Sequence, residues 1–237
     1  MKRLNDPEIV RQEYESEAAL AARRAAYVGA EGLDAPGMVF DAVAEVQPRR
    51  VLEVGCGMGQ LAERMHQELD AAVVAIDQSE RMVELTRARG VDARLGDVHE
   101  LPFDDGEFDV VVAAWMLYHV PDVEKALDEI VRVLRPGGRL VASTNRSDHL
   151  QELRDLTGVT RRGADGFDAD DAQRSLSPRF ASVDARDASG SVTFADREAV
   201  LAYVAPSAAW LGGVPEIPDL DEPLVVRRRP VVFVADK

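Results

Sequence analysis

A short apolar run that breaks into alternate glycines constrains the fold of this chain more than any other feature. Residues 51 to 59 read Val-Leu-Glu-Val-Gly-Cys-Gly-Met-Gly, so strand-forming residues run past an acid into a turn with three glycines. Residues without a Cβ atom let the main chain turn sharply and let another molecule lie against bare backbone. A helix over residues 60 to 69 would then present free N–H groups at the turn. The pattern predicts a strand that enters a ligand-binding turn, and a tight turn without a ligand is the alternative.

A second apolar run places another carboxylate near the first. Residues 72 to 76 are Ala-Val-Val-Ala-Ile, and Asp77 follows them directly. The carboxyl ends of parallel strands meet at one edge of a sheet, so we expect Glu53 and Asp77 at the same crevice. Two acids beside a turn without side chains suit a ligand that carries both a ribose and a positive charge.

The glycine spacing also fits a dinucleotide-binding turn. Residues 57 to 62 read Gly-Met-Gly-Gln-Leu-Ala, which matches that pattern with alanine in the last place. Glu53 separates the two interpretations. A dinucleotide would bring its anionic pyrophosphate close to this carboxylate, and like charges repel strongly in a partly dry crevice. A cofactor with an ammonium and a sulfonium would be attracted instead. The acid therefore favours S-adenosylmethionine over NAD(P).

Five motifs occur in one order and resemble those of class I S-adenosylmethionine-dependent methyltransferases. They are residues 53–59, the strand end 75–77, Gly96-Asp97 followed by Leu101-Pro102-Phe103, the run 108–112, and the turn 134–138. They resemble the group of the ubiquinone and menaquinone biosynthesis enzymes (the type 11 methyltransferase domain) over residues 36 to 145. The resemblance implies an α/β, Rossmann-like, doubly wound seven-stranded sheet in the order 3-2-1-4-5-7-6. Its last strand would be antiparallel, and N-terminal helices would form a lid.

The resemblance also assigns the contacts of the methionine and ribose parts of the cofactor. It places Glu53 near the amino group, directly or through water, and lines the methionine and ribose with Gly55, Cys56 and Gly57. Asp77 would accept hydrogen bonds from both ribose hydroxyls, which is a charge-assisted and geometrically selective use of one carboxylate.

The adenine contacts and the lid follow from the same resemblance. Gln78 would flank the adenine, although such enzymes usually have an apolar residue there. Asp97 would accept from the exocyclic amine and Val98 would donate its N–H to a ring nitrogen; a loop acid that satisfies its own turn is the alternative for Asp97. Ala114, at the end of the fourth strand, and Tyr14, from the lid, complete the predicted cofactor set, with Tyr27 as a second candidate for the lid tyrosine.

The segment after the fourth strand carries the candidate catalytic residues. Residues 113 to 122 read Ala-Ala-Trp-Met-Leu-Tyr-His-Val-Pro-Asp. Similar enzymes have a histidine at the place of His119, which would take a proton from the acceptor or hold it in line, as its unperturbed pKa near neutrality suits. A hydrogen bond to the backbone that braces the loop is the equal alternative. Tyr118 is a second candidate for contacting the acceptor, and some enzymes of this class use no base.

Charge and cysteine usage exclude several classes of function. The 237 residues carry a formal net charge of −15, whereas a phosphate backbone is held by clustered lysine and arginine, so we expect no nucleic-acid partner. No run reaches the length of a membrane span, and the first residues lack the apolar core of a signal peptide, so we expect a cytoplasmic protein without membrane insertion. The single cysteine, Cys56, offers neither a disulfide nor a metal cluster.

The remaining pattern predicts the order of elements and the domain plan. We expect helices at about residues 6–27, 36–46, 60–69, 79–89, 121–134 and 147–156, and further strands at about 93–95, 108–113, 139–143, 181–186 and 230–235. The chain reads as one methyltransferase domain over residues 1 to 237. Its parts would be a lid helix at 1–35, a cofactor-binding core at 36–145, and acceptor-side insertions with the C-terminal strands at 146–237. Residues 227 to 229, three arginines, are expected at the bend or edge of a C-terminal hairpin.

Three functions remain open at this point. A monomer or homodimer that moves a methyl group to oxygen, nitrogen or carbon of a small organic acceptor fits best. An NAD(P)-dependent oxidoreductase and a non-catalytic protein that binds S-adenosylmethionine are the alternatives.

Overall fold

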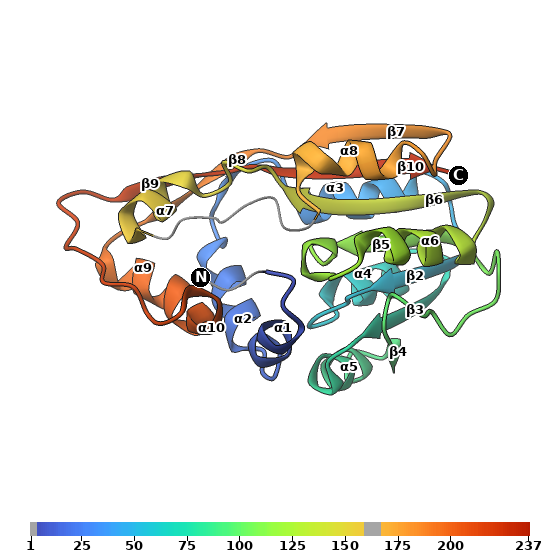
Figure 1. Ribbon diagram of the computed structural model, residues 1–237, viewed down its shortest axis with the longest axis horizontal. Helices are drawn as coiled ribbons and strands as arrows, with labels where there is room; N and C mark the ends of the chain where they lie inside the picture. The colour runs from blue at the N-terminus through green and yellow to red at the C-terminus, as the bar shows by residue number, and fades with distance from the viewer. Residues whose placement is uncertain (1–3, 159–166) are drawn as a thin grey trace.

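A seven-stranded sheet forms the centre of the computed structural model, which describes residues 4–158 and 167–237, apart from the side chains of residues 209 and 210. Its strands lie in the order β4-β3-β2-β5-β6-β10-β7 (Figure 1). Their bounds are β2 (Arg50–Val54), β3 (Ala72–Asp77), β4 (Asp92–Leu95), β5 (Phe108–Ala114), β6 (Leu134–Asn145), β7 (Ser182–Asp187) and β10 (Pro230–Asp236). β10 runs antiparallel to both β6 and β7, whereas β2 to β6 run parallel to one another. The predicted order 3-2-1-4-5-7-6 with its antiparallel last strand is confirmed.

Helices cover both faces of this sheet because its strands are apolar on both sides. Leu52 packs into one buried cluster with residues of α6 (Val123–Val133) and α8 (Ala169–Leu176). Its neighbour Val51 packs on the other face with residues of α3 (Ala35–Ala44), α4 (Gln60–Glu68) and α5 (Glu80–Arg87). The side chains of Ser79 and Asp122 cap α5 and α6 by accepting hydrogen bonds from backbone N–H groups in the first turn.

The N-terminal segment forms two helices where the sequence predicts one. The helices are α1 (Pro7–Glu13) and α2 (Ala18–Ala26), separated by residues 14 to 17. Two contacts with the first turn of α5 account for the break: the Tyr14 carbonyl accepts the Ser79 hydroxyl at 2.8 Å, and Glu17 accepts from Arg81 at 2.9 and 3.0 Å. Tertiary contacts therefore override the helix propensity of this segment.

A second, three-stranded sheet lies beside the first and was not predicted. It consists of β1 (Glu31–Gly32), β8 (Gly190–Phe194) and β9 (Leu224–Arg228), in the antiparallel order β1-β8-β9. β8 follows β7, and β9 leads into β10 through Arg229, so one long antiparallel ribbon passes from one sheet to the other, as Figure 1 shows. The helices α7 (Gln151–Thr157), α9 (Arg197–Val204) and α10 (Ala208–Leu211), with a 3₁₀ turn at Ala205–Ser207, accompany the smaller sheet.

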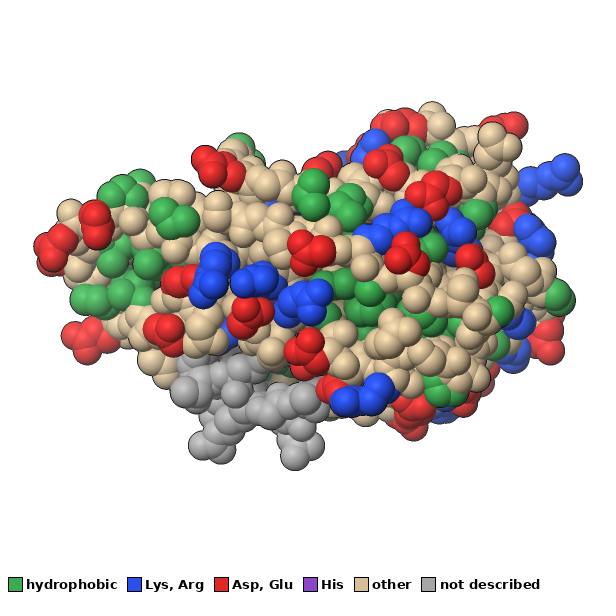
Figure 2. All heavy atoms as spheres, turned by 90° about the horizontal axis from the view of Figure 1, so that it is seen from above, with side chains coloured by type: hydrophobic (Ala, Val, Ile, Leu, Met, Phe, Trp, Pro, Cys, Tyr) green, Lys and Arg blue, Asp and Glu red, His purple; other side chains and the backbone are tan. Residues whose placement is uncertain are grey.

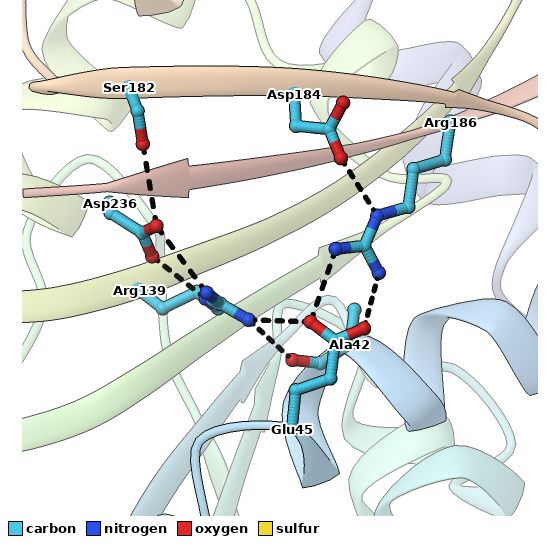
Figure 3. Close-up of polar contacts among 7 residues, drawn as sticks. All are labelled: Ala42, Glu45, Arg139, Ser182, Asp184, Arg186 and Asp236. Carbon is cyan, nitrogen blue, oxygen red and sulfur yellow. Dashed lines mark hydrogen bonds and ion pairs between the residues drawn. The ribbon is translucent and has the colours of Figure 1, made fainter.

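An ion-pair network ties the antiparallel edge of the large sheet to α3. Arg139 donates to Asp236 at 2.8 Å and to Glu45 at 2.9 Å, and Arg186 donates to the same Glu45 at 2.7 Å (Figure 3). The Arg186 and Arg139 guanidinium groups lower the pKa of the Glu45 carboxyl below its ordinary value. Four chain segments distant in sequence are thereby held together at one corner of the molecule.

The surface carries mixed charges on the face that Figure 2 shows, where acidic side chains lie around and between the basic ones. None of the helices in residues 4–158 and 167–237 combines the length and the apolar character that a membrane crossing requires.

Candidate functional site

A cavity of about 700 Å³ lies at the carboxyl ends of the central strands of the large sheet. Its floor comes from the ends of β2, β3 and β5, and its other walls come from α1, α2, α7, α9 and the end of β9. This volume falls within the range of roughly 300–1,000 Å³ that is typical of small-molecule sites. Every residue predicted for cofactor binding or catalysis lines it: Tyr14, Glu53, Gly55, Cys56, Gly57, Asp77, Gln78, Asp97, Val98, Ala114, Tyr118 and His119.

Glu53 is a buried acid at the end of β2 with an unsatisfied oxygen. The residue is 3% exposed, and its Oε2 atom has no hydrogen-bond partner among the described residues. Burial and the nearby Asp77 carboxylate raise its pKa to about 8. A buried carboxylate oxygen without a donor is costly, and a cationic ligand in the cavity would relieve that cost.

Asp77 holds the glycine turn in place and keeps acceptor capacity toward the cavity. Its Oδ2 accepts the Gly57 N–H at 2.9 Å and its Oδ1 accepts the Ser79 N–H at 3.0 Å. Burial raises its pKa, while these N–H groups oppose the shift. Each carboxylate oxygen has two lone pairs, so both oxygens retain one for the hydroxyls of a ribose.

The three glycines of the turn have different tasks. Gly55 has a φ of 71°, and a Cβ there would lie 2.7 Å from the Cβ of Met116, so the turn packs directly against the segment after β5. Gly57 lines the cavity with bare main chain. A Cβ at Gly59 would lie 2.5 Å from the Thr86 hydroxyl, so that glycine serves helix packing and not the cavity.

The loop after β4 supplies Asp97 and Val98, as predicted, and one residue that was not predicted. Asp97 Oδ1 accepts the His99 N–H at 2.9 Å and lies 2.6 Å from His99 Nδ1, so this oxygen satisfies its own turn. Its side chain is otherwise exposed at the rim. His99 Nε2 is buried in the cavity wall and has no hydrogen-bond partner among the described residues. This part of the cavity wall therefore has a further polar atom that the motif did not reveal.

His119 is engaged at both ring nitrogens. It lies in a 3₁₀ turn (Leu117–His119) after β5, where Nδ1 is 2.9 Å from the Leu4 carbonyl and Nε2 is 2.9 Å from the Tyr14 hydroxyl. A carbonyl only accepts, so Nδ1 carries the proton and Nε2 accepts from Tyr14. Burial lowers the pKa of His119 to about 3, which keeps the ring neutral at ordinary pH. The hydrogen bond to the backbone that the bracing alternative requires is therefore present, with the Leu4 carbonyl as the partner, and the Tyr14 hydroxyl adds a second contact.

The end of β5 is strained beside these groups. Trp115 has a φ of 54°, an unfavourable backbone conformation for a bulky residue. Its N–H donates to the Ser143 carbonyl at 3.0 Å, and its side chain lines the cavity with Ala114 and Tyr118. The Tyr118 ring packs edge-on against the His119 ring at 4.3 Å between centroids.

Cys56 is a packing residue in this arrangement. Its thiol is buried 3.4 Å from the Thr86 hydroxyl, and burial raises its pKa well above the ordinary value. No cluster of three metal-ligating side chains occurs within the described part of the chain.

Apart from Tyr27, the second candidate for the lid tyrosine, the opposite wall of the cavity consists of residues that the sequence did not assign to the site. This wall includes Arg23 from α2, Tyr27 at the end of α2, Tyr203 from α9 and Arg228 from β9. The hydroxyls of Tyr27 and Tyr203 lie 3.1 Å apart, and Arg23 forms an ion pair with Glu13 at 3.0 Å. These residues come from the segments without recognisable motifs. The sequence offered one signal for the burial of Arg228. Arg228 lies two residues after the apolar Val226, and both side chains are on the buried face of β9.

The residues present fit S-adenosylmethionine. An unpartnered carboxylate oxygen at Glu53 suits an ammonium group, Asp77 suits a ribose, and the bare turn at Gly57 leaves room beside both. The fold and this edge of the sheet together define the class I S-adenosylmethionine-dependent methyltransferase architecture.

Comparisons with known proteins identify the same family. Residues 52–142 match the family model described as "Methyltransferase domain". A demethylmenaquinone methyltransferase from Thermus thermophilus is 41% identical over 108 residues, which cover 43% of this chain and 49% of that protein. Residues 52–142 are therefore similar to a methyltransferase domain, which favours the methyltransferase interpretation over the nicotinamide one. The chain spans between a third and just over half of the length of the curated relatives it matches.

Two solved structures share the fold over nearly the whole chain. An S-adenosylmethionine-dependent methyltransferase from Thermotoga maritima aligns with a TM-score of 0.61 at 21% identity, covering 95% of this chain and 99% of that one. The [4+2]-cyclase SpnF aligns with a TM-score of 0.63 at 21% identity, covering 96% and 94%. Because one neighbour is named for a different reaction, the fold alone does not fix the chemistry.

Proposed function

We propose that this chain transfers a methyl group from S-adenosylmethionine to oxygen, nitrogen or carbon of a small organic acceptor in the cavity. The observation that carries the proposal is the buried, unpartnered carboxylate oxygen of Glu53 facing the same cavity as Asp77 and the bare turn at Gly57. A cationic nucleoside is the ligand that uses all three features.

The predicted cofactor residues take distinct roles in this proposal. Glu53 binds the amino group, Asp77 binds both ribose hydroxyls, and the turn from Gly55 through Cys56 lies against the methionine portion. Gln78, Asp97 and Val98 surround the adenine. Ala114 lines the cofactor part of the cavity at the end of β5, and Tyr14 closes the lid.

The protein contributes alignment more than covalent chemistry. S-adenosylmethionine supplies an electrophilic methyl group, whose bond to sulfur breaks as its bond to the acceptor forms. The walls exclude water and hold the acceptor in line. Tyr118 and His119 lie where the acceptor enters. His119 would act as a base only after the acceptor replaces the Tyr14 hydroxyl at Nε2, so in the arrangement seen it positions Tyr14.

The wider proposal keeps one functional unit. Residues 1–35 serve as the lid, 36–145 bind the cofactor, and 146–237 form the acceptor side. The unit would work in the cytoplasm as a monomer or homodimer on a small molecule, without a nucleic-acid partner, as the net charge of −15 supports.

The test is turnover with the full chain. Methyl-labelled S-adenosylmethionine is incubated with a panel of phenols, amines, carboxylic acids and activated carbon acids, and labelled product and S-adenosylhomocysteine are measured. Labelled product supports the proposal. Tight binding of S-adenosylhomocysteine without turnover on any acceptor supports the non-catalytic alternative instead.

A further inference from the structure

Arg228 is a buried cation whose two sequence neighbours are paired with acids while it is not. The residue is 9% exposed and lines the cavity. Arg227 forms an ion pair with Glu152, and Arg229 forms one with Asp148 at 3.5 Å. Arg228 donates only to the carbonyl oxygens of Ser191 at 3.4 Å and Glu31 at 3.0 Å, and forms no ion pair with any carboxylate in the described ranges.

The position of the guanidinium depends on two glycines. In the register of the small sheet, Arg228 lies opposite Gly190 on β8, and Gly190 lies opposite Gly32 on β1. A Cβ on Gly190 would lie 2.8 Å from Arg228 Nη2 and 2.2 Å from the Glu31 carbonyl, and a Cβ on Gly32 would lie 2.5 Å from the Gly190 Cα. The missing side chains allow the guanidinium to lie across β8 and reach β1.

The guanidinium keeps donors for a ligand. An arginine has five N–H donors in a planar fork, and the two carbonyls engage only Nε and Nη2. Nη1 donates to no described residue. The guanidinium carbon lies 5.4 Å from the centre of the Tyr27 ring, which supports one side of the fork. A buried charge without a counterion is costly unless a partner of opposite charge binds, so this geometry suits an anion.

The acidic and the basic side chains that line the cavity come from different helices and strands. The acids Glu53, Asp77 and Asp97 come from the strand ends of the large sheet, whereas Arg23, Arg154 and Arg228 come from α2, α7 and β9 on the opposite wall. In Figure 1, α2, α7 and β9 lie on one side of the molecule and the strands β2, β3 and β4 lie on the other. A negatively charged acceptor would be repelled from the cofactor end and attracted to the arginine end, which would orient it with its reacting atom toward the cofactor.

We propose that the methyl acceptor is a small carboxylic acid whose carboxylate binds Arg228 while its body packs against the wall that Tyr27 and Tyr203 form. This inference rests on the proposed function and names its substrate class. A carboxylate carries the single charge that one guanidinium balances, and it matches the planar fork in a bidentate manner. The tyrosine rings, with centroids 6.1 Å apart, provide an apolar wall with hydroxyls at one end.

The experiment compares matched acids and amides that differ in charge but hardly in shape. The full chain, saturated with S-adenosylhomocysteine, is titrated by calorimetry with 4-hydroxybenzoate and 4-hydroxybenzamide, indole-3-acetate and indole-3-acetamide, and hexanoate and hexanamide. In at least one pair the acid is expected to bind about tenfold or more tightly than its amide. Arg228→Gln should bring the acid down to the affinity of the amide and leave the amide unchanged.

The matched control is Arg227→Gln on the other face of β9. It removes the same charge from an exposed position outside the cavity and should preserve the preference for the acid. Arg228→Lys, which keeps the charge but loses the fork, should retain part of the preference, and it serves if Arg228→Gln fails to fold by circular dichroism.

Equal binding of acid and amide in every pair, including no detectable binding of either, would overturn the inference. So would an equal loss of acid and amide affinity in Arg228→Gln, because that result marks a merely structural arginine. Titration with S-adenosylhomocysteine alone separates this failure from failure of the proposed function. A protein that binds S-adenosylhomocysteine but shows no preference for acids contradicts only the substrate class.

Discussion

The Tyr14 hydroxyl donates a hydrogen bond to Nε2 of His119 across 2.9 Å, and this contact joins the N-terminal helices to the loop after β5. The two rings meet edge-on with centroids 5.5 Å apart. On the other side of the imidazole, Nδ1 donates to the Leu4 carbonyl. His119 therefore holds the N-terminal segment over the cavity through hydrogen bonds to two of its residues, Leu4 and Tyr14.

Tyr14→Phe should weaken the attachment of the N-terminal helices to the loop after β5. The change leaves a buried acceptor nitrogen without its donor, so we expect the free energy of unfolding to fall by about 1 kcal/mol and the affinity for S-adenosylhomocysteine to fall severalfold. Chemical denaturation and calorimetry measure the two effects. Tyr27→Phe is the matched control, because its hydroxyl contacts Tyr203 and not His119. Equal cofactor affinity in both variants would contradict a role of Tyr14 as a lid.

The depressed pKa of His119 predicts a loss of stability in mild acid. The folded-state pKa is about 3, below the ordinary value of 6.5, so the unfolded state binds the proton first as the pH falls. The stability that this residue contributes is complete above about pH 6.5 and is lost progressively between pH 6.5 and 3. His119→Asn should flatten the dependence of the melting temperature on pH in this window. The same change at the exposed His66 should leave the slope unchanged.

Glu53→Gln should change stability and binding in opposite directions. The folded-state pKa of about 8 exceeds the ordinary value of 4.5, so ionised Glu53 destabilises the ligand-free fold increasingly from pH 4.5 to 8. The amide removes this effect, and we expect the free energy of unfolding at pH 8 to rise by on the order of 2 kcal/mol. The affinity for S-adenosylhomocysteine should fall because its ammonium loses a charged partner.

Two further observations check the role of Glu53. In the wild type, the affinity for S-adenosylhomocysteine should increase from pH 6 to 8, since the complex favours the ionised carboxylate. Glu68→Gln, an exposed change on α4, should alter neither property. Unchanged binding by Glu53→Gln would place the ammonium elsewhere.

Arg139→Ala should destabilise the corner that Figure 3 shows. The side chain is 14% exposed and joins Glu45 on α3 to Asp236 on β10. We expect a loss of about 1–2 kcal/mol of unfolding free energy with no effect on S-adenosylhomocysteine binding. A double-mutant cycle with Glu45→Ala measures the coupling. A coupling of zero would show that the pair contributes nothing to stability.

The central sheet was predictable because its strands can be recognised from short apolar runs in the local sequence. β2 and β3 are apolar runs that carry Glu53 and Asp77 at or next to their carboxyl ends, and the order of the motifs predicted their neighbours. The three-stranded sheet was not predictable, because β1 has only two residues and β8 and β9 pair across a long insertion. The break between α1 and α2 depends on contacts with Ser79 and Arg81, which no local pattern encodes.

The residues of the candidate site also fall into two groups, those that the local sequence predicts and those that depend on tertiary contacts. Residues tied to a strand end or a glycine turn, such as Asp77 and Gly57, were identified from their spacing. Arg228 was hidden in a run of three arginines, of which only the middle one is buried. The partner of His119 depends on how the N-terminal segment crosses the sheet edge, which is a tertiary arrangement.

Calorimetric titration of S-adenosylhomocysteine into the wild type, Asp77→Ala and Asp92→Ala tests the central claim most directly. Asp77 faces the cavity from the end of β3, while Asp92 is an exposed acid on β4 paired with Arg94. The account predicts binding by the wild type and by Asp92→Ala, and a loss of about 2 kcal/mol or more for Asp77→Ala because both ribose hydrogen bonds disappear. No binding by the wild type, or equal affinity in all three proteins, would contradict the assignment of this cavity to the cofactor.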